Sequence, residues 1–166
     1  ALRPDRAILI DALLEAAHSL GLVLSTIPEA QGGGGETLSA VTGALIAEEL
    51  AWGDLALAVA ILSPTTLVIP LIEAGSEAQR GKYLPAFAGE RFAPASNALV
   101  EPQFGFNPRK PSTRATREGD GYVLEGTKCF VPVLEGEAPM LVFAREGTLL
   151  GQRFDLRIAE HAANLL

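Results

Sequence analysis

The chain has 166 residues, of which 48% are hydrophobic, and a formal net charge of -7 at pH 7. This composition belongs to a globular protein and excludes disorder as the main state. The negative charge argues against nucleic acid as a partner, because affinity for a phosphate backbone depends on clustered Lys and Arg. The single cysteine, Cys129, excludes an internal disulfide and favours a reducing compartment, so we expect a cytoplasmic protein.

Residues 4–20 predict an amphipathic helix that packs on one side. Its apolar side chains recur at close to helical spacing: Ile8, Leu9, Ala12, Leu13, Ala16, Ala17 and Leu20. Asp11, Glu15 and His18 occupy the other face. We interpret His18 as a surface residue and not a catalytic one, because no nucleophile or carboxylate pattern accompanies it.

Four consecutive glycines, residues 32–35, admit two interpretations. They could form a phosphate-binding loop, but the Lys-Ser/Thr of a P-loop and the spacing of a dinucleotide-binding fingerprint are both missing. We therefore predict a flexible turn that leads into the next helix.

Residues 37–52 predict a helix that is apolar nearly all round, and we expect it to be central in the fold. The pair Glu48 and Glu49 is its only charged step. Adjacent residues on a helix point about 100° apart, so these carboxylates cannot share one proton. We expect them to face solvent or a helix partner.

Residues 55–72 are uncharged and about long enough to span a bilayer. However, Ser63-Pro64 in the middle is a helix start signal, with Ser as the N-cap and Pro at the first helical position. We therefore predict two short buried helices and no membrane span. A further helix opens at Ser76, where Gln79 completes a capping box.

After Phe92 the pattern changes from helix to strand. Residues 113–117 and 122–124 flank a turn and predict a hairpin, and residues 127–133 and 140–144 predict further strands, the last of them buried. From Phe154 a helical stripe returns, in which His161 is interpreted as a surface residue. One hypothesis for this abrupt change is that residues are missing between Ala144 and Phe154.

These patterns predict an α+β protein. We expect an all-α helical domain over residues 1–92 and a partial antiparallel β domain over residues 93–152. Residues 153–166 would form a helical tail, which could begin a C-terminal helical domain.

Three runs in the second half carry a family signature: Val100-Glu101-Pro102, Gly105-Phe106-Asn107, and residues 121–132, which read Gly-Tyr-Val-Leu-Glu-Gly-Thr-Lys-Cys-Phe-Val-Pro. They resemble the flavin-contacting segment of the acyl-CoA dehydrogenases, where the runs read Thr-Glu-Pro, Gly-Ser-Asp and Gly-x-Tyr-x-Leu-x-Gly-x-Lys-x-Trp-Ile-Thr. The resemblance extends in the correct order over about residues 27–145.

The resemblance implies an α+β fold of the acyl-CoA dehydrogenase type, FAD as cofactor, and α,β-dehydrogenation of an acyl-CoA thioester. It also implies an electron-transfer flavoprotein as a partner and a homo- or hetero-oligomer. The family's catalytic base, a glutamate, lies in its C-terminal domain and has no assigned counterpart here.

Carried over residue by residue, the resemblance assigns seven positions to the cofactor. Leu99 and Val100 would offer backbone groups to the flavin pyrimidine edge, and Gly105 and Phe106 would lie near the pyrophosphate. Phe130 would replace the family's tryptophan, with Val131 and Pro132 following along the ring.

Val100, Phe106 and Pro132 each replace a hydroxyl residue of the family pattern. If each hydroxyl makes one ordinary hydrogen bond, the loss is roughly 1 kcal/mol apiece, or about a hundredfold in flavin affinity together. The alternative function is therefore a non-catalytic relative with a decayed flavin site, acting as a structural or partner subunit.

A basic cluster in this otherwise acidic chain has two interpretations. Its members are Arg109, Lys110, Arg114 and Arg117. They could hold the cofactor pyrophosphate or the CoA phosphates, or they could form a solvated hairpin face. We interpret Cys129 as a buried structural thiol, since no histidine nearby in the sequence could activate it as a nucleophile.

Overall fold

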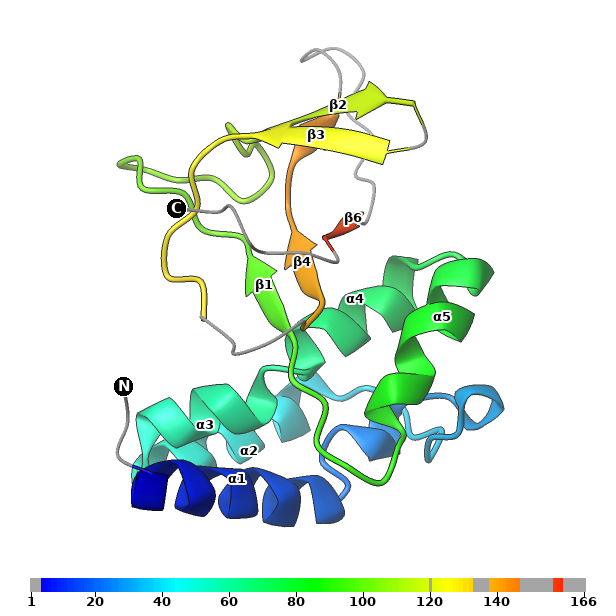
Figure 1. The fold of residues 1–166 in the computed structure, drawn as a ribbon, viewed down its shortest axis with the longest axis vertical. Helices are drawn as coiled ribbons and strands as arrows, with labels where there is room; N and C mark the ends of the chain where they lie inside the picture. Colours follow the sequence, from blue (N-terminus) through cyan, green and yellow to red (C-terminus); the bar gives the residue numbers. More distant parts are fainter. Residues whose placement is uncertain (1–3, 120, 133–137, 147–156, 160–166) are drawn as a thin grey trace. The chain divides into compact units, whose positions relative to one another are not determined.

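The structure is a computed structural model that describes residues 4–119, 121–132, 138–146 and 157–159. Its contacts divide the chain into two compact units, residues 1–94 and 95–166. The first unit is helical and the second contains the strands (Figure 1). A helical domain followed by a small sheet confirms the predicted fold class.

The first unit contains five α-helices and two short 3-10 helices within its described residues. They are α1 (Pro4–Ser19), η1 (Leu24–Thr26), η2 (Glu29–Gln31), α2 (Ala40–Gly53), α3 (Leu55–Leu62), α4 (Thr65–Ala74) and α5 (Glu77–Phe87). Its core is formed mainly by Ile27, α4 and α5. The most deeply buried apolar side chains are Ile27, Leu67, Val68, Leu71, Leu84 and Phe87.

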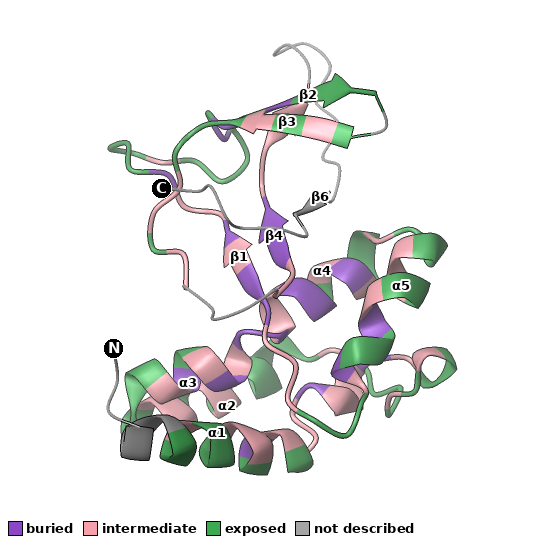
Figure 2. Ribbon diagram, in the orientation of Figure 1, coloured by how far each residue is buried: buried purple, intermediate pink, exposed green. Residues whose placement is uncertain are grey.

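The prediction that α2 is central is wrong. No residue of α2 is buried, and Val41 and Trp52 are 71% and 91% exposed. The apolar residues Ile8 and Leu9 of α1 are also exposed, and Figure 2 shows exposed positions along this helix. A hydrophobic pattern indicates a surface suited to burial, but the described part of this chain supplies no element to cover these two faces.

The glycine run forms a tight turn in which its backbone N–H groups donate hydrogen bonds to nearby backbone carbonyls. The N–H groups of Gly33, Gly34 and Gly35 donate to backbone carbonyls of Pro28, Leu24 and Ile27. A Cβ on Gly33 would lie 2.0 Å from the Ile27 carbonyl oxygen, so only glycine fits there. These donors are not free to bind phosphate. The chain turns here as predicted, but hydrogen bonds hold the turn, which is not the flexible one expected.

Helices α3 and α4 confirm the predicted break at Ser63-Pro64, but the capping differs. Pro64 is the N-cap of α4, and the buried Ser63 Oγ finds no hydrogen-bond partner in the described chain. By length and composition alone, Ile8–Thr26 and Leu55–Ala74 are each long and apolar enough to cross a membrane, but the core helix of a soluble protein meets the same two criteria. The absence of a membrane span therefore stays a prediction.

Two other local predictions for this unit are confirmed. Ser76 Oγ accepts from Gln79 N–H and Gln79 Oε1 accepts from Ser76 N–H, which is the capping box at the start of α5. Glu48 and Glu49 are exposed. His18 departs from the predicted surface residue: it is half-buried, and its Nε2 lies 2.8 Å from the Gly89 carbonyl oxygen, a contact that ties α1 to the turn after α5.

Within its described residues, the second unit contains two three-stranded sheets, ordered β1-β4-β6 and β3-β2-β5. The strands are β1 (Ser96–Ala98), β2 (Arg114–Glu118), β3 (Gly121–Glu125), β4 (Met140–Val142), β5 (Arg145–Glu146) and β6 (Arg157–Ala159). The predicted hairpin is β2 and β3, and β4 is buried throughout as expected. Ala98, Met140 and Val142 form a small core with Leu124 and Val131 packed against it.

Two details of the second unit correct the sequence predictions. The sheets are mixed: β1 pairs with β4 and β2 pairs with β5 in parallel, because intervening chain returns each strand in the same direction. Residues 127–132 form no strand, since Phe130 has a φ of 54° and Pro132 has no N–H to donate.

The predicted helical tail is wrong for the residues that the structure describes there. Arg157–Ala159 is a strand that pairs antiparallel with β4. The apolar strand β4 therefore gains a partner on the edge that β1 leaves open, which outweighs the weak helical stripe. The rest of the predicted tail, with Phe154 and His161, lies outside the described residues, as does the region of the hypothesised gap after Glu146.

Candidate cofactor-binding site

Two segments far apart in the sequence lie side by side in the second unit. Cys129 N–H donates to the Val100 carbonyl oxygen over 2.9 Å, and Ser96 Oγ donates to the Pro132 carbonyl oxygen, also over 2.9 Å. Val131 packs on the core that contains Ala98. The chain that follows β1 is thus held alongside residues 128–132.

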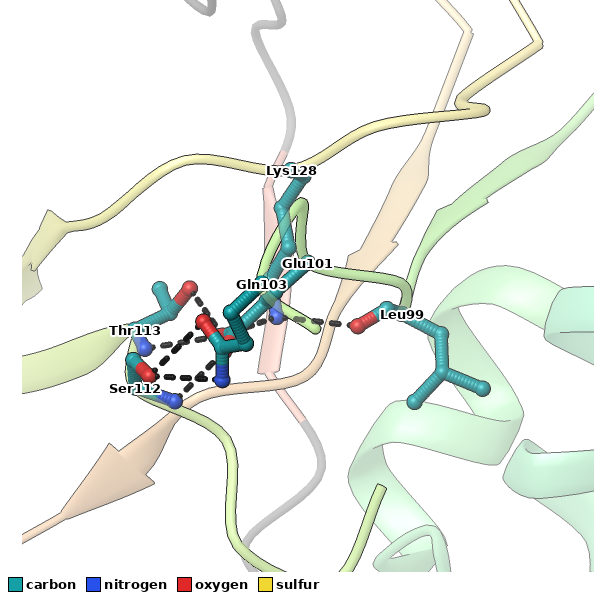
Figure 3. A network of polar contacts seen from close by, with 6 residues as sticks. All are labelled: Leu99, Glu101, Gln103, Ser112, Thr113 and Lys128. Carbon is teal, nitrogen blue, oxygen red and sulfur yellow. Dashed lines mark hydrogen bonds and ion pairs between the residues drawn. The ribbon is translucent and has the colours of Figure 1, made fainter. Parts of the chain in front are cut away.

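The carboxylate of Glu101 joins these segments to the loop that precedes β2. Glu101 is 3% exposed and accepts hydrogen bonds from Ser112 N–H at 2.6 Å, Thr113 N–H at 2.8 Å and Thr113 Oγ1 at 2.6 Å (Figure 3). Gln103 adds a longer contact at 3.2 Å. The carboxylate therefore closes the neck of the loop over residues 102–111.

Lys128 balances the buried charge of Glu101. The side chains of Lys128 and Glu101 are 5% and 1% exposed, and Nζ lies 2.9 Å from Oε1. The same Nζ donates to the Leu99 carbonyl oxygen at 3.1 Å. Burial alone would raise the pKa of Glu101, but the hydrogen bonds from Thr113, Ser112 and Lys128 outweigh it and lower the pKa to about 2.

Close backbone packing accompanies this network. A Cβ on Gly126 would lie 2.5 Å from Thr113 Oγ1 and 2.7 Å from Thr113 Cα. Only glycine lets the chain pass this close to Thr113. Gly126, Thr113, Glu101 and Lys128 thus form one interlocked frame.

Glu101 and Lys128 both lie within the family runs, but the resemblance assigns neither of them a role. Neither charged residue is part of a solvated charge pattern, and Lys128 lies in a run predicted as a strand. A lysine and a glutamate in apolar surroundings must be paired if they are buried, so the signal that identifies this pair was present in the sequence.

The structure places Leu99 and Val100 at the end of β1, both half-buried. Their carbonyl oxygens are engaged, by Lys128 Nζ and by Cys129 N–H. Their N–H groups find no hydrogen-bond partner among the residues that the structure describes. Within the described chain these two N–H groups are therefore backbone donors that no other group uses.

Phe130 stands apart from its neighbours in conformation and exposure. Its φ of 54° is left-handed, which is strained for an aromatic residue, and its side chain is 90% exposed. Val131 and Pro132 are half-buried. The strained backbone presents the aromatic ring of Phe130 instead of packing it.

Gly105 and Phe106 are not brought to this group by any contact in the described chain. They lie in the loop that Glu101 closes, where Gly105 has a φ of 71° and Phe106 is half-buried.

The basic cluster is fully on the surface, with Arg109, Lys110, Arg114 and Arg117 all exposed. Both interpretations of that cluster stay open. Cys129 is a free thiol and only half-buried.

Comparison with known proteins gives a consistent result. The family model for the acyl-CoA dehydrogenase N-terminal domain matches residues 4–91, which is just over half of the chain. The probable medium-chain specific acyl-CoA dehydrogenase 2 of Caenorhabditis briggsae is 36% identical over 119 residues, covering 72% of this chain and 28% of that protein.

Two solved structures agree in fold. Butyryl-CoA dehydrogenase from Megasphaera elsdenii matches with a TM-score of 0.71 and 27% identity, over 92% of this chain and 41% of that one. An acyl-CoA dehydrogenase complexed with FAD from Bacillus anthracis matches with a TM-score of 0.67 and 30% identity, over 91% of this chain and 26% of that one. This chain spans less than a third of the curated relative and less than half of either structure. Its match to the N-terminal domain model and its helical domain with a small sheet show that the chain belongs to the acyl-CoA dehydrogenase family.

Proposed function

We propose that this chain is the flavin-contacting N-terminal part of an FAD-dependent acyl-CoA dehydrogenase, which introduces an α,β double bond into an acyl-CoA thioester. The observation that carries the proposal is a pair of N–H groups, on Leu99 and Val100, that have no partner among the described residues and lie next to the segment that presents Phe130. Two donors beside an exposed aromatic ring fit a planar heterocycle with carbonyl groups on one edge.

The residues present fit such a cofactor in part. Leu99 and Val100 would donate to the pyrimidine edge, and Phe130 would lie against the ring system. Val100, Phe106 and Pro132 offer no hydroxyl, and the Pro132 carbonyl oxygen already accepts from Ser96. The site would therefore hold FAD mainly through backbone donors and an aromatic surface.

Within the reaction this chain would bind, orient and shield. Bound FAD would supply the acceptor for the hydride that leaves the β-carbon of the substrate. The N–H groups of Leu99 and Val100 would fix the register of the ring, and Phe130 would exclude water from one side of it. The base that removes the α-proton would come from a part of the protein outside this chain.

The absence of three family hydroxyls favours a second candidate function. A non-catalytic relative that lacks flavin could act as a structural or partner subunit of an active dehydrogenase.

For the first function we propose an electron-transfer flavoprotein as the electron acceptor, a homo- or hetero-oligomeric assembly and a cytoplasmic location.

The visible absorption spectrum of the purified full-length protein separates the two functions. The dehydrogenase should be yellow and should release FAD into the supernatant on denaturation. A colourless protein that also fails to take up added FAD would contradict the proposal and favour the partner subunit.

A double variant tests the placement of the cofactor. Val100→Thr with Phe106→Ser restores two hydroxyls, so flavin retention should rise by about tenfold or more if each makes one hydrogen bond. Val123→Thr, at an exposed position on β3, is the matched control and should leave retention unchanged. Equal retention in the double variant and the wild type would count against this placement.

A further inference from the structure

The contact between Lys128 and the Leu99 carbonyl oxygen has a geometric consequence for the next amide. The chain has no cis peptide bond among its described residues, so the peptide between Leu99 and Val100 is trans. In a trans peptide the C=O and N–H groups point in opposite directions. Because Lys128 Nζ holds the carbonyl oxygen at 3.1 Å, the Val100 N–H points away from Lys128.

Lys128 is itself held in place and cannot move freely. Its Nζ is paired with Glu101 Oε1 at 2.9 Å, and Glu101 is fixed by the donors of Ser112 and Thr113 (Figure 3). Lys128 thus holds the peptide group that precedes Val100, and Cys129 N–H holds the peptide group that follows it by donating to the Val100 carbonyl oxygen. Val100 is therefore clamped through both of its peptide groups, and its N–H is the group left without a partner in the described chain.

The charge of Lys128 also changes the strength of that donor. A charge-assisted hydrogen bond to a carbonyl oxygen polarises the whole peptide group, which makes its N–H a stronger donor. An apolar side chain at position 128 would give neither the fixed orientation nor the polarisation. The pair with Glu101 needs only one of the ammonium's three donors, so charge balance alone does not explain the contact with Leu99.

We propose that Lys128 is a positioning residue for the cofactor: it aims and strengthens the Val100 N–H that donates to the electron-rich pyrimidine edge of the flavin. This inference rests on the proposed function. In this proposal Lys128 does not touch the ligand. It nevertheless changes both the affinity of the protein for flavin and the reduction potential of the bound flavin.

The test compares three full-length proteins, namely the wild type, Lys128→Met and Tyr122→Phe. Tyr122→Phe is the control. The Tyr122 hydroxyl contacts Glu146 Oε1 at 3.3 Å, so this variant loses a polar contact in the same unit and keeps the contacts of Lys128 and Cys129 around Val100. For each protein we would measure the dissociation constant for FAD, the reduction potential of bound flavin, and the thermal midpoint.

Lys128→Met should weaken FAD binding by about tenfold, as expected for the loss of one aligned hydrogen bond, and should shift the flavin potential to more negative values. Tyr122→Phe should lower the thermal midpoint and leave affinity and potential unchanged. If Lys128→Met changes only the thermal midpoint, Lys128 is merely structural and the inference is overturned.

A second variant covers the case in which an unpaired buried Glu101 prevents Lys128→Met from folding. The double variant Glu101→Gln with Lys128→Met removes both buried charges together. It still lacks the contact to Leu99, so it should show the same weakening and the same shift in potential. Wild-type affinity in this variant would overturn the inference while the proposed function stands, whereas a wild type that binds no FAD would overturn both.

Discussion

Replacing Glu101 with glutamine should destabilise the protein in a way that depends on pH. The carboxylate is buried, accepts three hydrogen bonds of 2.6–2.8 Å and balances Lys128. Glutamine keeps the shape but turns one acceptor into a donor that faces other donors. It also leaves the ammonium of Lys128 without its partner.

The magnitude follows from the pKa of Glu101, which folding lowers from 4.5 to about 2. A group whose folded pKa is depressed stabilises the protein above its unfolded pKa, and this stabilisation is lost as the pH falls through the folded value. Each pKa unit corresponds to about 1.4 kcal/mol, so ionised Glu101 contributes about 3 kcal/mol at pH 7. The contribution should be lost between pH 4.5 and pH 2.

Urea unfolding of the full-length protein, followed by far-UV circular dichroism at several pH values, measures this contribution. The free energy of unfolding of the wild type should exceed that of Glu101→Gln by about 3 kcal/mol at pH 7, and by less than half of that at pH 3. The exposed Glu118 on β2 supplies the control, since Glu118→Gln should change little at any pH. A wild-type advantage over Glu101→Gln that stays constant with pH would refute the assignment of the lowered pKa to this residue.

The same unfolding assay checks three further variants. Gly126→Ala should lower the free energy of unfolding by about 2 kcal/mol or more, because its Cβ would lie 2.5 Å from Thr113 Oγ1; no loss would mean that Gly126 can move away. Ser76→Ala removes the capping box of α5 and should cost about 1 kcal/mol. Phe130→Gly should raise the free energy of unfolding by about 1 kcal/mol, because it relieves a left-handed backbone at 54°. If the proposed function holds, Phe130→Gly should also weaken FAD binding in a titration.

Local signals predicted the helices well and the long-range contacts poorly. The capping box at Ser76 and the break before α4 depend on neighbouring residues, so the sequence contains everything that defines them. Whether α2 is buried depends on which other elements pack on it, and no residue of α2 is buried in the described chain. This chain spans only 28% of a curated relative. No pattern within residues 37–52 could have shown that its partner is absent from the described chain.

The strand pairing shows the same limit. Hairpin β2-β3 was predictable because its turn lies between its strands, but the parallel pairing of β1 with β4 joins residues 44 positions apart at Ser96 and Met140. The three residues of β6 also have too little sequence to carry a strand signal of their own. Their conformation is decided by the open edge of β4.

The candidate site divides into two kinds of position that respond differently to substitution. Glu101, Lys128, Thr113 and Gly126 contact one another, so changing one leaves a buried charge or a steric clash that the fold must absorb. Phe130 projects outward, and the hydrogen bonds that hold Val100 involve backbone groups and not its side chain: Lys128 binds the preceding carbonyl oxygen and Cys129 N–H binds its own. Substitutions at Val100 and Phe130 can therefore change what the site binds while the frame stays folded. An intact frame and a lost flavin are thus compatible in this protein, and for that reason stability measurements on the frame and absorption measurements on the flavin address separate properties.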